Sequence, residues 1–293
     1  MNSKIDLHIH SNKSSDGDFS PFHIVQLAKE NALRAISITD HDTVAAYPEA
    51  IEFGIKVGVE VIPSIELTTL FDGREFHLLL PFVDWEEKTV FDLINKVVES
   101  RFKEAKERVR ILKKIGFDIS WKEVLKKSRS NPPLGVTIAQ ILLDKAEKQE
   151  NPAFKKYLEG ANRLFAPYSF YKDYFMEGKP AYVSKQSLDL LDVLKVAPKT
   201  EAVPVLSHPG AYFQQARKED LIILKESGLV GLEVYTFYHD SSLKEYYKEV
   251  AQELDLVPTA GSDFHGKIKP HIHFGSLEGG EYWMIEELRK RRK

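Results

Sequence analysis

Short apolar runs alternate with amphipathic helical patterns at both ends of the chain. The run IDLHIH at 5–10 is followed by Ser20-Pro21, a helix N-cap and first-turn pair that opens the amphipathic stretch PFHIVQLAKENA. Further strand candidates lie at 34–39, 59–68, 75–83, 203–210, 230–236 and 256–266, and further helices are expected over about 44–57 and from about Gly280. Some seven strand candidates separated by helices predict an α/β fold with a parallel barrel. In such barrels the active site lies at the carboxyl ends of the strands.

The alternation is interrupted between residues 87 and 178, where the pattern is helical almost throughout. Apolar residues recur there at three- and four-residue spacings, as at Val90, Ile94, Val97, Phe102, Ala105, Val109 and Leu112. We therefore expect a helical insertion domain at 87–178 that covers or flanks the barrel mouth. The barrel domain would be formed by 1–86 and 179–293.

The first part of this insertion is rich in positive charge. From Arg101 to Arg129, eleven Lys and Arg residues stand against four Asp and Glu residues. Such a run is usually the solvated face of a helix, and a basic lid over a phosphate-binding mouth is the alternative. The RKRRK tail at 289–293 is expected to end a helix, where cations suit the negative end of the dipole.

Composition limits the chemistry that the chain can support. The 293 residues include no cysteine, which excludes disulfides, thiolate metal ligands and a cysteine nucleophile. A hydrophobic content of 43% supports a substantial core, and a net charge of -3 gives no general attraction to nucleic acid or anionic membranes. The N-terminal residues lack the apolar core of a signal peptide and no apolar run is long enough for a membrane span, so we expect a cytoplasmic protein.

Histidines and carboxylates gather at the predicted strand ends. His8 and His10 are two positions apart, so on a strand both side chains point to the same face, although such pairs also occur on solvated edge strands. Further candidate ligands at or near the other strand ends are Asp16, His41, Glu66, His77, His208, Asp263 and His265. These nine nitrogen and oxygen ligands are too many for one ion. The sequence therefore predicts a cluster of two or three divalent metal ions.

The order of these motifs resembles the PHP (polymerase and histidinol phosphatase) family. The resemblance rests on DLHIHS, ITDHDT, SHPG and GSDFHG, with Glu66 and His77 between the second and third motifs, and it covers nearly the whole chain. The helical insertion and EGKPAYV at 177–183 resemble the bacterial subgroup that acts on nucleotides and RNA 5′ ends. The resemblance implies a distorted (β/α)7 barrel with a trinuclear metal site.

The resemblance also implies how the ligands are shared among three metal ions. The first ion would be held by His8, His10, Glu66 and Asp263. The second would be held by Asp16, His41 and His265, and the third by His77, His208 and a bridging Glu66. Imidazole-rich sites suit zinc, manganese and iron alike, so the identity of the metal stays open.

The expected activity is that of a metal-dependent phosphoric ester hydrolase. It would release phosphate from a nucleoside monophosphate or a 3′,5′-bisphosphate by attack of metal-activated hydroxide. His208 or His265 would give a proton to the leaving oxygen, and Asp263 would balance metal charge. The alternatives are a 5′-3′ exonuclease on short RNA, a histidinol or sugar phosphatase, and a metal-binding regulatory module without catalysis. No protein partner is evident.

Substrate contacts are expected from the insertion, where the chain departs from its subgroup. Related proteins carry a Gly-Arg-Pro-His-like stretch, and this chain has Gly135-Val136-Thr137 there, so a cation and an imidazole are missing. Arg101 and Lys185 are candidate replacements, and each could instead be a solvated surface residue. The positive excess of the insertion would favour substrates with a second phosphate or a short nucleic acid strand.

Two pairs of residues have more than one interpretation. Asp6 and Asp40 could accept hydrogen bonds from the ligand imidazoles, or could be strand-end residues that bind turn backbone. His271 and His273 form another HxH pair. No carboxylate stands beside that pair, and we expect a surface or strand pair without a metal.

Overall fold

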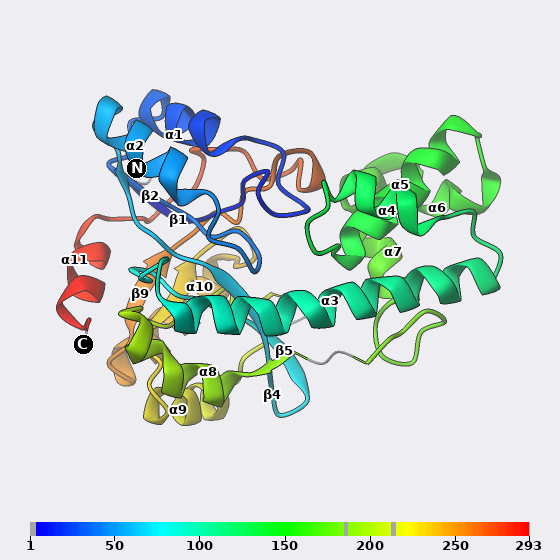
Figure 1. Cartoon of the computed structure of the whole chain (residues 1–293). Helices are drawn as coiled ribbons and strands as arrows, with labels where there is room; N and C mark the ends of the chain where they lie inside the picture. The colour runs from blue at the N-terminus through cyan, green and yellow to red at the C-terminus, as the bar shows by residue number, and fades with distance from the viewer. Residues whose placement is uncertain (1–3, 185–186, 212–214, 293) are drawn as a thin grey trace.

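Two hydrogen-bonded sheets form the centre of one half of the molecule, in a computed structural model that describes residues 4–184, 187–211 and 215–292. The smaller, parallel sheet has the order β1 (Ile5–Ile9), β2 (Ala35–Ile38) and β3 (Glu60–Val61). The larger sheet has the order β6 (Leu188–Asp189), β4 (Glu66–Phe71), β5 (Arg74–Leu79), β7 (Val205–Leu206), β8 (Gly231–Tyr235) and β9 (Val257–Ala260). We call these sheets and the helices that cover them the strand body (Figure 1).

The two sheets meet at isolated backbone bridges rather than in one continuous ladder. Parallel bridges join Ile9 to Phe264 and His41 to Glu66. Beside the first bridge, the amide of Asp263 donates to the carbonyl of His8 over 2.8 Å. The segments that carry the candidate ligands thus lie next to one another, and the predicted α/β class is confirmed.

The parallel order expected from the alternating pattern does not hold at β5, which runs antiparallel to both β4 and β7. β4 and β5 are joined only by Asp72 and Gly73, which have φ values of 50° and 71°. A two-residue turn with two positive φ values forms a hairpin, whereas a parallel connection needs a dozen or more residues. The expected strand at 59–68 is also divided, with Pro63 between β3 and β4.

Helices cover the strand body on its outside. They are α1 (Pro21–Glu30), α2 (Tyr47–Val57), α8 (Leu190–Val196), α9 (Lys218–Glu226), α10 (Ser241–Glu253) and α11 (Trp283–Lys290). The predicted cap of α1 is confirmed, because the Ser20 side chain accepts a hydrogen bond from the His23 amide. In the described part of the chain, no helix is both long and apolar enough to cross a membrane.

The expected helical segment begins with the long helix α3 (Lys88–Lys114), which runs from the strand body to a separate group of helices (Figure 1). That group, the helical lobe, contains α4 (Trp121–Lys127), α5 (Gly135–Lys148), α6 (Lys155–Leu158) and α7 (Ala166–Tyr174). Val90 at the start of α3 packs in the core of the strand body, whereas Val109 and Leu112 near its end pack in the core of the lobe. Two separate cores support our proposal that residues 87–178 form a domain of their own.

A buried carboxylate ties the hairpin to α9. Arg74 of β5 donates two hydrogen bonds to Asp220, of 2.7 and 3.0 Å, and the Arg217 amide donates a third of 2.8 Å. Burial would raise the pKa of Asp220, but these hydrogen bonds hold it below its ordinary value.

We predict that Asp220→Asn lowers the free energy of unfolding by about 1–3 kcal/mol at neutral pH, because it removes charge-assisted hydrogen bonds. A carboxyl group with a lowered pKa stabilises the fold above its unfolded pKa of about 3.9, and this stabilisation is lost as pH falls further. Urea unfolding between pH 7 and pH 3 should therefore show the difference from the wild type shrinking in acid. Glu219→Gln, which alters an exposed carboxylate of the same helix turn, is the control and should change little.

Candidate metal centre

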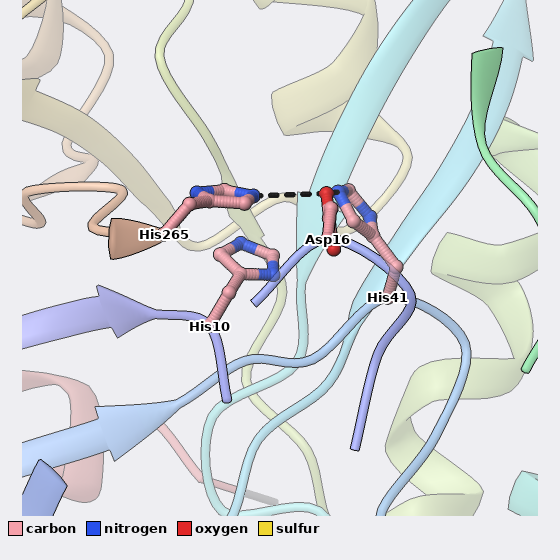
Figure 2. A group of neighbouring side chains, drawn as sticks. All are labelled: His10, Asp16, His41 and His265. Carbon is pink, nitrogen blue, oxygen red and sulfur yellow. Dashed lines mark ion pairs between the residues drawn. The ribbon is translucent and has the colours of Figure 1, made fainter. Parts of the chain in front are cut away.

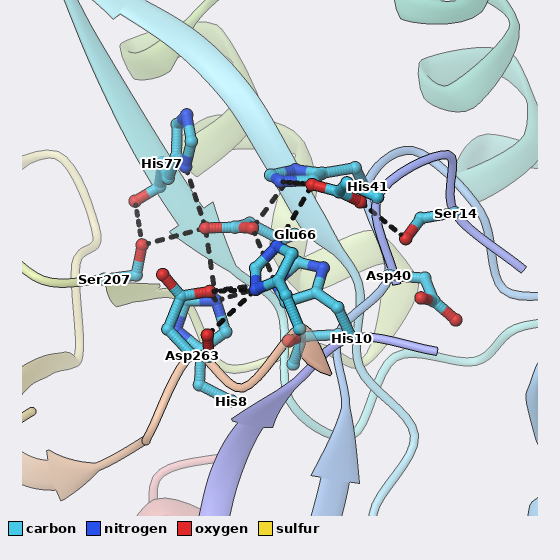
Figure 3. A network of polar contacts seen from close by, with 12 residues as sticks. His8, His10, Ser14, Asp40, His41, Glu66, His77, Ser207 and Asp263 are labelled. Carbon is cyan, nitrogen blue, oxygen red and sulfur yellow. Dashed lines mark hydrogen bonds and ion pairs between the residues drawn. The ribbon is translucent and has the colours of Figure 1, made fainter. Parts of the chain in front are cut away.

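Four of the candidate ligands converge on one point at the strand ends (Figure 3). His8 lies in β1 and His10 directly after it, Glu66 begins β4, and Asp263 follows β9. His8 Nε2 lies 3.1 Å from His10 Nε2 and 3.4 Å from Glu66 Oε1. Asp263 Oδ1 lies 3.4 Å from His8 Nε2 and 3.3 Å from His10 Nε2. Nitrogen and oxygen ligands of a tetrahedral ion, each about 2.0–2.2 Å from the metal, are themselves about 3.3–3.6 Å apart.

The other candidate ligands flank this group on two sides. In one flanking group (Figure 2), Asp16 Oδ2 lies 3.0 Å from His265 Nε2 and 3.6 Å from His41 Nε2. On the other side, Glu66 Oε1 lies 2.9 Å from His77 Nδ1 and 3.4 Å from His208 Nε2. The structure thus brings all nine predicted ligands together, as four overlapping groups that could hold metal ions.

Two buried atoms in the centre show that a cation fits this site. Glu66 Oε2 and His41 Nδ1 lie 3.1 Å apart, and neither makes a hydrogen bond within the described part of the chain. Burying polar atoms that make no hydrogen bond is costly. A shared cation would accept the lone pairs of both the carboxylate oxygen and the imidazole nitrogen.

The carboxylates of the centre are held in their charged form. Burial opposes ionisation, but His41 and the neighbouring imidazoles hold the pKa of Glu66 well below its usual value. Imidazoles act in the same way on the pKa of Asp16, and Lys269 acts so on that of Asp263. Glu66, Asp16 and Asp263 are therefore available as anionic ligands.

Hydrogen bonds to the outer ring nitrogens orient two of the histidines. His8 Nδ1 lies 3.1 Å from Glu233 Oε1, and His265 Nδ1 lies 2.8 Å from the carbonyl of Asp263. Both acceptors require a proton on Nδ1, which leaves the Nε2 lone pairs facing the centre. Glu233 was not among the predicted site residues, although a glutamate inside the apolar run VGLEVYT is unusual. In the structure this glutamate is fully buried.

Asp6 and Asp40 bind backbone rather than imidazoles. Asp6 Oδ1 accepts from the Ser262 amide over 2.9 Å, and Asp40 accepts from both the amide and the hydroxyl of Ser11. The turn interpretation holds for both carboxylates.

Asp263 and His208 have positive φ values of 59° and 26°. Such backbone costs on the order of 1–3 kcal/mol outside glycine and is typical of functional sites. The Tyr238 hydroxyl donates to Asp263 Oδ2 over 2.7 Å, and buried Lys269 forms an ion pair with the same oxygen. Neither Tyr238 nor Lys269 was among the predicted site residues, because their contacts with Asp263 depend on the tertiary fold.

The second HxH pair is not part of the candidate metal centre. The His271 ring contacts the ring of Phe165 at 4.8 Å, His273 is exposed, and neither lies in a strand. Among the described residues, neither histidine belongs to a group that could hold a metal.

A cavity of about 460 Å³ joins the candidate ligands to the helical lobe. Arg101 of α3 lines it, and its guanidinium binds Asp42 and Thr68 instead of lying in solvent. Lys185, the other predicted substrate contact, lies outside the described residues.

The basic run of the insertion faces solvent for the most part. Of its eleven Lys and Arg residues, only Arg101 and Arg108 line the cavity, and the other nine are exposed. The solvated-face interpretation holds for these residues except Arg129, whose guanidinium binds backbone of the strand body.

The loop that carries Asp16 is held by an arginine of the insertion. Arg129 donates to three backbone carbonyls of this loop, those of Asn12, Ser14 and Gly17, over 3.1, 2.8 and 2.7 Å. The Ser14 hydroxyl in turn donates to Asp16 Oδ1 over 2.8 Å. The insertion thereby helps to position one of the candidate ligands.

Known protein families and structures resemble this chain. Residues 6–175, more than half of the chain, match the family described as the PHP domain. The chain belongs to the PHP domain family. Its full length also aligns with a protein from Bifidobacterium adolescentis assigned to the metal-dependent phosphoesterases, with a TM-score of 0.82, 24% identity, and coverage of 99% and 96% of the two chains. This likeness shows the fold.

Three curated relatives of this PHP domain protein carry names for phosphoester chemistry. A 5′-3′ exoribonuclease of Haemophilus influenzae is 26% identical over 90% of this chain and 91% of the relative. A phosphoribosyl 1,2-cyclic phosphate 1,2-diphosphodiesterase of Eggerthella lenta is 28% identical over 92% and 97%. A 3′,5′-nucleoside bisphosphate phosphatase of Chromobacterium violaceum is 23% identical over 89% and 87%. The expected class of phosphoric ester hydrolase agrees with these names.

We predict that His8→Ala combined with His10→Ala lowers the metal content of protein reloaded with manganese or zinc by at least about one ion per chain. His271→Ala combined with His273→Ala should leave it unchanged, because that pair lies outside the candidate groups. Elemental analysis measures both. A wild-type content below one ion per chain would contradict the metal cluster.

We also predict that Arg129→Ala weakens binding of the most weakly held ion about 10- to 100-fold, because the loop of Asp16 loses three hydrogen bonds. Calorimetric titration of metal-free protein with Mn²⁺ measures this change. Arg110→Ala, at an exposed arginine of α3 that pairs with Glu107, is the matched control. Unchanged affinities in the Arg129 variant would show that the loop holds its shape alone.

Proposed function

We propose that this protein is a metal-dependent phosphoesterase that releases phosphate from nucleotides. The observation that carries the proposal is the convergence of nine candidate ligand side chains, most of them buried, seven of which line a cavity large enough for a small molecule. The names of the relatives support a nucleotide-type substrate, a nucleoside monophosphate or a 3′,5′-bisphosphate.

The proposed metal site holds two or three divalent ions. Its ligands would be His8, His10, Asp16, His41, Glu66, His77, His208, Asp263 and His265. Divalent ions bound there would lower the pKa of a water molecule and neutralise charge on the phosphoryl oxygens. Glu66 would face all of the ions, since its two oxygens lie against imidazoles of each group.

The hydrolysis consumes one water molecule. The water oxygen bonds to phosphorus, the ester P–O bond breaks, and one proton reaches the leaving oxygen. His208 and His265 both line the cavity, and one of them would transfer this proton. Lys269 and Arg101, also in the cavity wall, would offer positive charge to the phosphoryl group.

A 5′-3′ exonuclease acting on short RNA is the second candidate, because the Haemophilus influenzae relative carries that name. Both activities would use the same centre and would differ in the product that is released. The products therefore distinguish them: free phosphate from a nucleotide, or mononucleotides from the 5′ end of an RNA.

We predict that Glu66→Gln lowers kcat/KM for phosphate release about a thousandfold or more while the protein stays folded, because a central charge is lost. The assay uses metal-loaded protein with AMP, adenosine 3′,5′-bisphosphate and a short 5′-phosphorylated RNA, with circular dichroism to check the fold. Glu52→Gln, at an exposed carboxylate of α2 outside the cavity lining, is the control. Retention of most activity by Glu66→Gln would contradict the proposed centre.

A further inference from the structure

Aromatic side chains of α7 and of Phe175, which directly follows it, form part of the cavity wall. Tyr168, Tyr171 and Phe175 all line the cavity. They follow one another at spacings of three and four residues, so they lie on one face of the helix. Next to them the wall continues with the backbone and small side chains at the start of α5, Gly135 and Val136.

The ring of Tyr171 is held firmly in this wall. A Cβ atom at position 135 would lie only 2.6 Å from Cε2 of Tyr171, so Gly135 lets the ring rest against the start of α5. The ring of Phe175 contacts it edge-on, with ring centres 5.7 Å apart. The Arg108 guanidinium lies 5.6 Å from its centre. The ring of Tyr171 is therefore fixed in position before any ligand arrives.

The aromatic wall begins beside the candidate metal ligands. Lys269 forms an ion pair with Asp263, and its Nζ lies 5.8 Å from the ring centre of Tyr168. A substrate whose phosphoryl group lies beside the candidate metal ligands would therefore extend along Tyr168 towards Tyr171.

Charges that the insertion brings to the cavity cancel. Among the described residues of 87–178, the wall contains Arg101 and Arg108 against Glu104 and Glu177. Arg101 is bound by Asp42, and Arg108 by Glu104 over 2.7 Å. This part of the wall suits an uncharged planar group better than a second phosphate.

We propose that the aromatic wall binds the base of the nucleotide by stacking, chiefly on Tyr171, and so makes the base rather than a distal phosphate the selected group. The inference rests on the proposed function. Stacking on an aromatic ring accepts any base, because every base has a π face. The enzyme would therefore discriminate nucleotides from sugar phosphates without reading the base sequence.

The first test compares AMP with ribose 5-phosphate, which has the same phosphate and sugar but no base. Metal-loaded wild-type protein should have a kcat/KM at least about tenfold higher for AMP. Tyr171→Leu should reduce that ratio at least about tenfold, and Tyr171→Phe should preserve it. Phe91→Leu, at a 46% exposed aromatic residue of α3, is the control and should not alter the ratio.

The second test needs neither metal nor hydrolysis. Adenosine, titrated into metal-free protein in a calorimeter, should bind more tightly than ribose, and Tyr171→Leu should weaken its binding about tenfold or more.

The outcomes separate the two proposals. Similar kcat/KM values for AMP and ribose 5-phosphate, or equal losses for both in Tyr171→Leu, would overturn the base site and leave the phosphoesterase intact. Failure to hydrolyse any of these phosphate esters would overturn the proposed function. Adenosine binding that depends on Tyr171 would then still support the base site.

Discussion

A buried carboxylate surrounded by imidazoles is the interaction on which the strand ends depend. Glu66 is 1% exposed, and nitrogen atoms of five histidines, His8, His10, His41, His77 and His208, lie 2.9–3.4 Å from its oxygens. Burying a carboxylate costs several kcal/mol unless it is paired. These histidines come from different strand ends, so satisfying this one charge requires several strands to stop at the same place. The arrangement of the strand ends and the chemistry of the centre therefore depend on each other.

The candidate site could be predicted from the sequence more completely than the sheet around it. The histidines and carboxylates were found because each stands at a strand end beside its own turn residues, as His208 does in SHPG. Glu233 and Lys269 were missed because their contacts depend on how β8 and the segment after β9 pack. The antiparallel course of β5 was missed although Asp72-Gly73 is a hairpin signal, because the alternation of strands and helices elsewhere favoured a parallel order.

Counting the charges along the insertion does not predict which of its side chains face the cavity. Its length and its helical period were predictable, and α3 buries the expected apolar positions, with Phe102 only partly covered. Which of its faces meets the cavity depends on the angle at which the lobe packs, and no local pattern encodes that angle. The basic side chains point away from the cavity for the most part, whereas tyrosines from a later helix, α7, enter the wall.

The contact of Arg129 with the loop of Asp16 has a consequence for exchanging parts between members of this family. The lobe is joined to the strand body by α3 and also by the Arg129 guanidinium, which donates to three backbone carbonyls. This contact therefore depends on the backbone shape of the loop and not on the side chains of the loop. A lobe transplanted from another member would need an arginine at the same height above that loop. Without it, the loop that carries Asp16 would lose these three hydrogen bonds, and one edge of the candidate metal centre would be less firmly held.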